Sequence, residues 1–199
     1  ARPATLRAMD GRPHFPPRRS RAELEAALPD ILAAPKDEGR LEAIVVRPAK
    51  GARLTPGRVR LSRAGGVEGD HWARGCHLST GDGRPHPDVQ VCMMGARTIR
   101  AIAGPRENWA PAGDNLFLDL DLGPDNLPPG TRLALGTAVL EITAEPHNGC
   151  AQFVERFGRD ACVFVNAGPG KTHRLRGVYA RVARDGDVAV GDVARVLGR

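Results

Sequence analysis

The segment from residue 145 to residue 179 holds the side chains best suited to chemistry. Cys150 ends a polar lead-in and directly precedes a stretch with apolar residues at helical intervals. A thiol at the start of a helix lies near the positive end of the helix dipole and near amides without intrahelical acceptors, which favours its ionised, nucleophilic form. Basic residues on the same segment would stabilise that thiolate and attract an anionic ligand if they converge on it. They are Arg156, Arg159, Lys171, His173, Arg174 and Arg176.

Each of these features also has a plainer interpretation. A cysteine is most often a small buried residue, and arginines usually form a solvated basic surface. The glycine-rich turn at residues 166–170, which places Asn166 beside the basic run, is more often a loop than an anion cradle. The polar residues 145–149 favour an exposed turn for Cys150. The coincidence of thiol, basic residues and glycine-rich turn in one segment favours a reactive cysteine beside an anion site.

A set of short motifs runs in order through most of the chain. It comprises Gly65-Gly-Val-Glu-Gly-Asp-His71, Gly113-Asp-Asn-Leu116, Leu127-Pro-Pro-Gly-Thr-Arg-Leu133, Val139-Leu-Glu-Ile-Thr143, Cys150, and Arg174-Leu-Arg-Gly-Val-Tyr179 with Gly186 and Gly191-Asp192. In this set the chain resembles the MOSC domain family, named for the C-terminal domain of molybdenum cofactor sulfurases. The resemblance spans roughly residues 41–197 and rests on the order of the motifs, since no single one is decisive.

The resemblance implies a β-rich, barrel-like domain and a role for the cysteine matched by Cys150, which carries sulfur or contacts the molybdenum of a pterin cofactor. It places the loop at residues 65–71 near the cofactor pocket, which makes Asp70 and His71 candidates for orienting a ligand or transferring a proton. Asn115 is a candidate for a hydrogen bond to the ligand. The alternatives are an acidic turn with an exposed histidine and an asparagine that satisfies its own backbone.

Two mechanisms and one passive role follow from this. In the first, Cys150 accepts sulfur as a persulfide from a donor protein such as a cysteine desulfurase, and His147 or His71 moves protons. In the second, Cys150 ligates the molybdenum of molybdopterin while basic residues hold the pterin phosphate, as in amidoxime-reducing relatives. Those relatives have a more extended N-terminal domain, for which this chain has little room, so we expect a sulfur-carrier or sulfur-transfer enzyme. The third reading is a module that binds a small anion without chemistry.

Charge, aromatic content, apolar runs and cysteine spacing indicate which ligands and partners to expect. The formal charge of +6 suits a small anionic ligand. The basic residues are scattered and aromatics are scarce, so we expect no specific nucleic-acid partner. We expect no membrane partner, because no apolar run of about eighteen residues and no secretory signal is present. The four cysteines lack zinc-like or Cys-x-x-Cys spacing, which favours free thiols in a reducing cytoplasm. We expect Cys92 to be a core residue, and Cys162 to be either a core residue or a resolving thiol.

The remaining pattern predicts many short strands and few helices. We expect an N-terminal tail at residues 1–19 and a helix at 20–32, so that residues 1–40 pack on a main domain formed by residues 41–199. Asp185 and Gly186 predict a hairpin turn. Such a chain is expected to form a closed or nearly closed β-barrel with a few peripheral helices and the site at its mouth. The expected strands are at residues 41–47, 57–62, 89–94, 117–120, 130–135, 138–143, 179–183 and 188–197, with helices at 97–103 and after Cys150.

Overall fold

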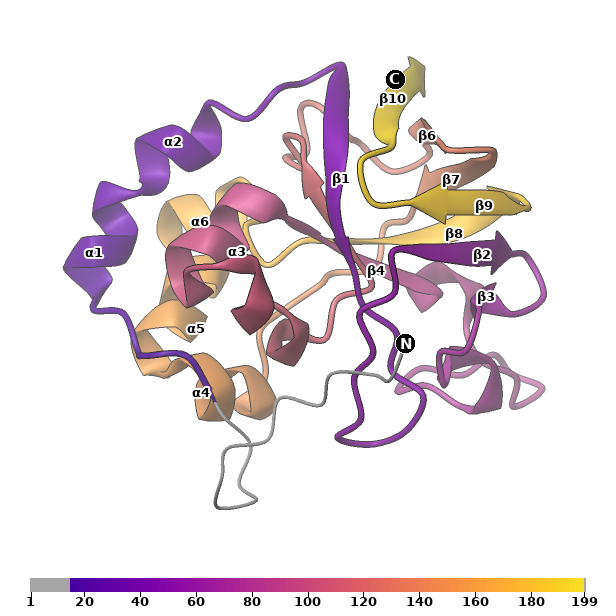
Figure 1. Cartoon of the computed structure of the whole chain (residues 1–199), viewed down its shortest axis with the longest axis horizontal. Coiled ribbons are helices and arrows are strands. Elements are labelled where there is room, and N and C mark those ends of the chain that lie inside the picture. The colour runs from indigo at the N-terminus through magenta and orange to yellow at the C-terminus, as the bar shows by residue number, and fades with distance from the viewer. Residues whose placement is uncertain (1–14, 199) are drawn as a thin grey trace.

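Seven strands close into a barrel in the computed structural model, which describes residues 15–198 (Figure 1). The strand order is β1-β10-β6-β7-β8-β4-β5, and every neighbouring pair is antiparallel except β4 and β5. The closed barrel predicted from the sequence is therefore confirmed. Its strands are β1 (Glu38–Ile44), β4 (Val91–Gly95), β5 (Leu116–Asp119), β6 (Arg132–Leu135), β7 (Ala138–Ile142), β8 (Val178–Arg184) and β10 (Val193–Gly198).

The barrel interior is an aliphatic core. In β6 and β7 the pleat sends Leu133, Leu135 and Leu140 inward, all at most 1% exposed. Fully burying each leucine contributes about 1.5–3 kcal/mol of transfer free energy. Because alternate residues of a strand face opposite sides, the short alternating runs of the sequence are enough to define this inner face.

Strands β4 and β5 lie between the barrel core and a second, helical core. Met93 and Leu116 point into the barrel, whereas Met94 and Phe117 pack among the helices. The helix α3 (Ala96–Ala103) connects the two parallel strands, as a parallel pair requires, and the 3-10 turns η3 (Arg106–Asn108) and η4 (Ala110–Ala112) follow it. Burial on both faces explains why residues 91–94 of β4 are all apolar.

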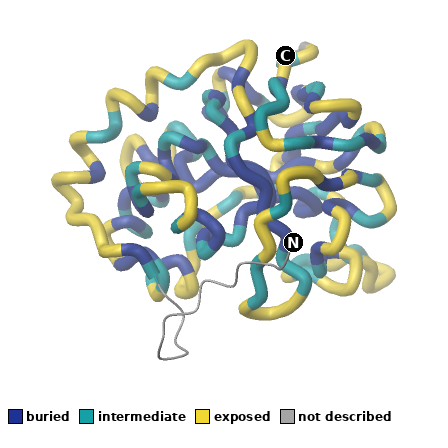
Figure 2. Tube along the Cα trace, viewed as in Figure 1, coloured by how far each residue is buried: buried dark blue, intermediate teal, exposed yellow. Residues whose placement is uncertain are grey.

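The other helices form a layer on one side of the barrel. These helices are α1 (Arg21–Ala26), α2 (Leu28–Leu32), α4 (Ala151–Phe157), α5 (Arg159–Asn166) and α6 (Gly168–Thr172). Ser20 and Glu23 form the predicted capping box, but the expected helix at 20–32 is divided at Ala27 because Pro29 begins a new first turn. The helix after Cys150 is likewise interrupted at Gly158, whose φ is +90°. Figure 2 shows the outermost helices mostly exposed and the strands mostly buried.

A small second sheet, ordered β3-β2-β9, lies beside the barrel. It consists of β2 (Arg58–Ser62), β3 (Gly66–Val67) and β9 (Gly186–Ala189). The hairpin predicted at Asp185 and Gly186 is wrong, because β9 pairs with β2 and not with β8. Strand β8 already pairs with β4 on one edge and β7 on the other, so it has no free edge for β9.

The N-terminal helix is attached to the helical layer through α5. The backbone amide of Arg21 donates to Asp160 Oδ2 at 3.1 Å, and Leu24 is fully buried. Most of the expected tail, residues 1–14, lies outside the described residues, as does residue 199. Over residues 15–198, no helix has the length and apolar character needed to cross a membrane. Two further 3-10 turns, η1 (Trp72–Arg74) and η2 (Pro87–Val89), flank the loop at residues 75–86.

Candidate functional site

Cys150 is the residue that opens α4. It has an extended backbone (φ −114°, ψ −176°), its carbonyl accepts the first hydrogen bonds of the helix, and its thiol is exposed and free. Phe153 and Phe157 anchor the helix because both are 2% exposed within the helical core. The predicted exposed thiol at the start of a helix is therefore confirmed.

The turn before Cys150 is fixed by Asn166 at the end of α5. Asn166 Oδ1 accepts from the amide of Gly149 at 2.9 Å, and Asn166 Nδ2 donates to the carbonyl of Gly149 at 3.1 Å. Both polar groups of one peptide residue are thus held by one side chain. The sequence suggested Asn166 as a ligand-binding residue, and the structure places it where it positions the cysteine turn.

Two arginines flank Gly113, which precedes β5. A Cβ at Gly113 would lie 3.5 Å from Arg53 Nη2 and 3.7 Å from Arg156 Nη1. Among residues 15–198 neither arginine forms an ion pair; Arg156 donates to Pro111 O at 2.8 Å and Arg53 to Ala52 O at 2.6 Å. We call Arg53 and Arg156 the unpaired arginines.

The unpaired arginines repel each other electrostatically. Burial, together with the positive charges of Arg156 and Arg47, lowers the pKa of Arg53 to about 10. Burial also lowers the pKa of Arg156, while the nearby Cys150 opposes that change. Among the described residues, the buried Arg53 Nε has no hydrogen-bond partner. Cation next to cation with a buried free donor is an arrangement that an anion would relieve.

Arg176, Asp114 and His147 form a buried triad. Arg176 Nη1 donates to both carboxylate oxygens of Asp114, at 2.8 and 2.9 Å, and its guanidinium carbon lies 4.9 Å from the centre of the Phe153 ring. His147 Nδ1 lies 3.6 Å from Asp114 Oδ1, too far for a hydrogen bond. The Phe153 contact connects this triad to the helix that Cys150 opens.

His147 is held in its neutral form. Its side chain is 5% exposed. Burial, followed by the charges of Arg176, Arg47 and His77, lowers the pKa of His147 well below its usual value. The ring stacks at 4.3 Å on Tyr179, and Nδ1 has no hydrogen-bond partner. A neutral imidazole with a free nitrogen is suited to accept a proton.

Arg47 and Asp70 form a second buried ion pair next to these residues. Burial tends to raise the pKa of Asp70, but the hydrogen bonds and charge of Arg47 outweigh it, and the pKa lies below its ordinary value. Asn115 is fully buried and bonds Asp70 Oδ2, Val45 O, Arg47 Nη2 and the amide of Cys92. These contacts use the hydrogen-bonding capacity of its amide, so Asn115 orients its neighbours.

Cys92 is buried, as expected of a core residue, yet it faces the same network. Arg47 Nη1 lies 3.5 Å from Cys92 Sγ. Burial raises the pKa of the Cys92 thiol, with Arg47 acting in the opposite direction. The thiol is 6% exposed, so bulk solvent does not reach it as it reaches Cys150.

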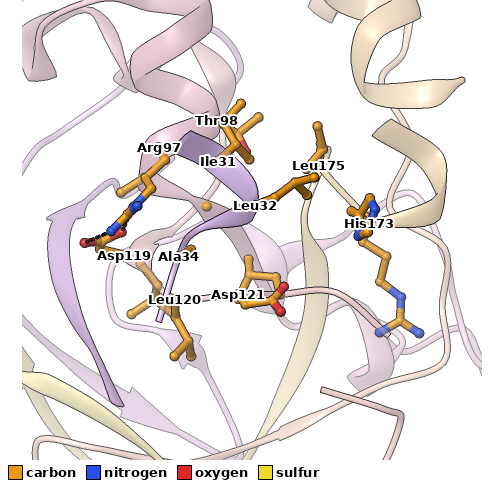
Figure 3. A pocket seen from close by; sticks show the side chains of 15 residues that line it. Ile31, Leu32, Ala34, Arg97, Thr98, Asp119, Leu120, Asp121, His173 and Leu175 are labelled. Carbon is orange, nitrogen blue, oxygen red and sulfur yellow. Dashed lines mark hydrogen bonds and ion pairs between the residues drawn. The ribbon is translucent and has the colours of Figure 1, made fainter. Parts of the chain in front are cut away.

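Three of the basic residues suggested by the sequence do not join Cys150. Lys171 is exposed on α6, and Arg174 Nη1 donates to Leu127 O at 2.9 Å. His173 and Arg174 line a cavity that Leu118 and Asp119, the last residues of β5, also line (Figure 3), whereas Arg156 lies near Gly113, before that strand. His71 Nδ1 lies 3.2 Å from Gly75 O on its own loop. The structure therefore groups Arg156, Arg176, His147 and Asp70 around the cysteine helix and leaves the others apart.

Two arginines of the site, Arg47 and Arg53, were not anticipated. Arg47 follows the apolar run at residues 43–46. A single charged residue directly after a buried strand could have marked it as a candidate site residue. Arg53 lies in a turn segment rich in glycine and proline with no pattern to distinguish it. Within the part of the chain that the structure describes, no group of three or more His, Cys, Asp or Glu side chains could hold a metal ion.

Solved structures resemble this fold. The YuaD protein from Bacillus subtilis is 21% identical, with a TM-score of 0.57 over 80% of this chain and 95% of that one. YiiM from Geobacillus stearothermophilus is 17% identical, with a TM-score of 0.53 over 81% of this chain and 76% of that one. YiiM from Escherichia coli is 20% identical, with a TM-score of 0.51 over 80% and 70% of the two chains. At these identities the likeness shows the shared fold alone.

The sequence comparisons agree with the structural ones. No curated protein matches the chain. The family model described as MOSC domain matches residues 80–195, more than half of the chain, and this span contains β4 to β9, the first residues of β10, the cysteine helix, Asp114 and Arg176. The chain therefore belongs to the MOSC domain family.

Proposed function

We propose that this protein is a sulfur carrier or sulfur-transfer enzyme in which Cys150 takes up sulfur as a persulfide beside a site for an anionic ligand. The observation that supports this best is the exposed Cys150 next to the half-buried Arg156, which shares the space around Gly113 with Arg53. A free thiol on the surface is common, but two half-buried guanidinium groups without carboxylate partners beside it are not.

The energetics favour an anion at the unpaired arginines. Two like charges about 4–8 Å apart repel each other by about 2–4 kcal/mol at an effective dielectric constant of about 20. An anion between Arg53 and Arg156 replaces this repulsion with two attractions and gives the buried Arg53 Nε an acceptor. The carboxylates Asp70 and Asp114 do not serve this purpose, because each is already bonded to another arginine.

The proposed step conserves atoms and electrons. The Cys150 thiolate attacks the outer sulfur of a donor persulfide, a new sulfur–sulfur bond forms on Cys150, and the donor leaves as its thiolate. A cysteine desulfurase or another protein that carries a persulfide is the class of donor this chemistry requires. The neutral His147 accepts the proton of a thiol, and Asp114 stabilises the imidazolium that results.

A second candidate is a molybdenum-cofactor protein, and the residues present fit such a group. Cys150 offers an exposed thiolate ligand, and Arg53 and Arg156 offer donors to a phosphate. When bound, the metal would supply redox chemistry at the cysteine. The protein's own contribution would be to hold the phosphate with the unpaired arginines and to accept a proton at His147 Nδ1.

The test compares wild type with Cys150→Ser in sulfur transfer from a small organic persulfide to cyanide, read as thiocyanate. The proposal predicts turnover that is lost in Cys150→Ser, while circular dichroism shows an unchanged fold. Wild type that produces no thiocyanate above the uncatalysed rate contradicts sulfur transfer. Metal analysis that finds molybdenum bound through Cys150 would support the second candidate, and pterin binding unaltered in Cys150→Ser without turnover would support a passive module.

A further inference from the structure

We propose that Cys162 is the resolving thiol of this site and releases the sulfur carried by Cys150 by forming a Cys150–Cys162 disulfide. This inference rests on the proposed persulfide chemistry and adds a second cysteine to it. The two residues come from neighbouring helices, α4 and α5, which pack on each other.

The geometry places the Cys162 sulfur directly against the cysteine turn. A Cβ on Gly149, the residue before Cys150, would lie only 3.2 Å from Cys162 Sγ and 2.9 Å from Asn166 Nδ2. Asn166 Nδ2 also donates to Cys162 Sγ at 3.3 Å while it holds the Gly149 carbonyl. The same asparagine therefore positions the turn that carries one thiol and the sulfur of the other.

A disulfide sets a limit on how far apart the two cysteines can be. Consecutive Cα atoms are about 3.8 Å apart, and disulfides join Cα atoms about 4.4–6.8 Å apart. Cys162 Sγ lies within contact distance of the point where a side chain on Gly149 would begin, so joining it to Cys150 Sγ requires the Cys150 side chain to rotate and the exposed turn to move toward Cys162. Gly149 is what allows this approach, because any side chain at that position would press on the sulfur.

The other thiols are placed differently. Cys92 is buried against Arg47 Nη1. Cys76 donates to Leu78 O at 2.7 Å in a separate cluster with Trp72. Cys162 is half-buried and, unlike these two, contacts the segment that presents Cys150. It is therefore the thiol best placed to reach a persulfide on Cys150.

The resolving step is an ordinary thiol–disulfide exchange. The Cys162 thiolate attacks Cys150 Sγ of the persulfide, one sulfur–sulfur bond forms, the bond to the terminal sulfur breaks, and that sulfur leaves with the electron pair as hydrosulfide. The two cysteines end as a disulfide, which a dithiol reductant must reduce before the next cycle. The product of one turnover is thus one hydrosulfide and one intramolecular disulfide.

The experiment follows hydrosulfide release after the full chain is loaded with a small persulfide donor and the excess donor is removed. Wild type should release its sulfur and gain the Cys150–Cys162 disulfide, seen by peptide mapping. Cys162→Ser should keep the persulfide, with release slowed by about tenfold or more. Cys76→Ser, the matched control for loss of a partly buried thiol, should behave as wild type. Equal release from wild type and Cys162→Ser would overturn the inference.

Oxidation by diamide separates this inference from the proposed function. Diamide needs no persulfide, and it should join Cys150 to Cys162 in wild type but much less in Gly149→Ala, in which both thiols are intact. If Cys150 takes up sulfur but neither treatment joins it to Cys162, the resolving role fails and the sulfur carrier stands. If diamide joins the pair but Cys150 never takes up sulfur, the sulfur-transfer proposal fails and the resolving role falls with it.

Discussion

Arg47 and Asp70 form a bidentate ion pair, with Arg47 Nε 2.9 Å from Asp70 Oδ2 and Arg47 Nη2 3.0 Å from Asp70 Oδ1. Arg47 Nη1 also donates to Gly113 O at 3.0 Å, and Asn115 bonds both members of the pair. The pair thereby joins the end of β1, the loop before η1 and the segment that leads into β5. The Arg47–Asp70 pair holds the segment at Gly113, which the unpaired arginines flank. We therefore assign this ion pair the role of a rigid base for the site.

The first prediction concerns this base. Asp70→Asn should destabilise the protein by about 3–5 kcal/mol, because it removes one partner of a buried ion pair and leaves the other charge uncompensated. Asp70 is 1% and Arg47 14% exposed, so solvent screens the loss only weakly. Urea unfolding measures the change. The control is Glu38→Gln, which breaks an exposed pair with Arg195 and should change little; equal effects from both variants would contradict the assignment.

The second prediction concerns the pH dependence of stability through His147. Burial holds the pKa of His147 in the folded state well below 6.5, so the unfolded chain binds a proton that the folded chain does not. Stability should therefore be fully present above about pH 6.5 and fall as the pH is lowered, by at most about 1.4 kcal/mol per pH unit from this group. His147→Gln should flatten the curve of unfolding free energy between about pH 7 and pH 5. An unchanged slope would show that His147 is not buried in its neutral form.

The third prediction concerns the charge next to Cys150. Iodoacetate and iodoacetamide alkylate thiols similarly but differ by one negative charge. The ratio of their rates at Cys150 should fall by about tenfold in Arg156→Gln at low ionic strength, because the site loses a cation that attracts the anionic reagent. Arg159→Gln is the matched control, since Arg159 is an exposed arginine at the start of α5. Mass spectrometry of the alkylated peptide gives both rates. If both variants keep the wild-type ratio, the unpaired arginines do not act on the thiol.

The fourth prediction concerns the glycine-rich turn. Gly170 lies in α6, where a Cβ would overlap the carbonyl oxygen of Phe164. Gly170→Ala should therefore cost about 1–3 kcal/mol or more, because the backbone must move apart. Gly81→Ala, at an exposed position with nothing near its Cβ, is the control. Thermal unfolding of the two variants gives the comparison, and equal melting temperatures would contradict the close packing of α6 on α5.

Local patterns explain which parts of the fold could be predicted. Strand β2 alternates clearly between exposed and buried residues, β7 is an almost entirely apolar run, and the Ser20 capping box marks the start of α1, so their positions follow from neighbouring residues alone. The partner of β9 could not be predicted in this way. Its choice of β2 depends on β8 having both edges occupied, which is a property of the closed barrel.

The site shows the same division between local and tertiary information. Cys150 was predicted because its polar lead-in and the helix that follows are adjacent in sequence. Arg53 was missed because it comes near Arg156 only through the folding of a distant turn onto Gly113. Lys171 and His173 follow Cys150 in sequence, but Lys171 is exposed on α6 and His173 lines the cavity at the end of β5. Sequence proximity to a nucleophile was therefore a poor guide to which cations surround it.

The most direct test of the central claim is the intact mass of the protein after incubation with a persulfide donor, followed by peptide mapping. The account predicts a gain of one sulfur atom on the peptide that contains Cys150, reversed by a dithiol reductant and absent in Cys150→Ser; the assay is run in Cys162→Ser so that the sulfur is retained. A sulfur found on Cys76 or Cys92 instead, or no gain in mass at all, would contradict it.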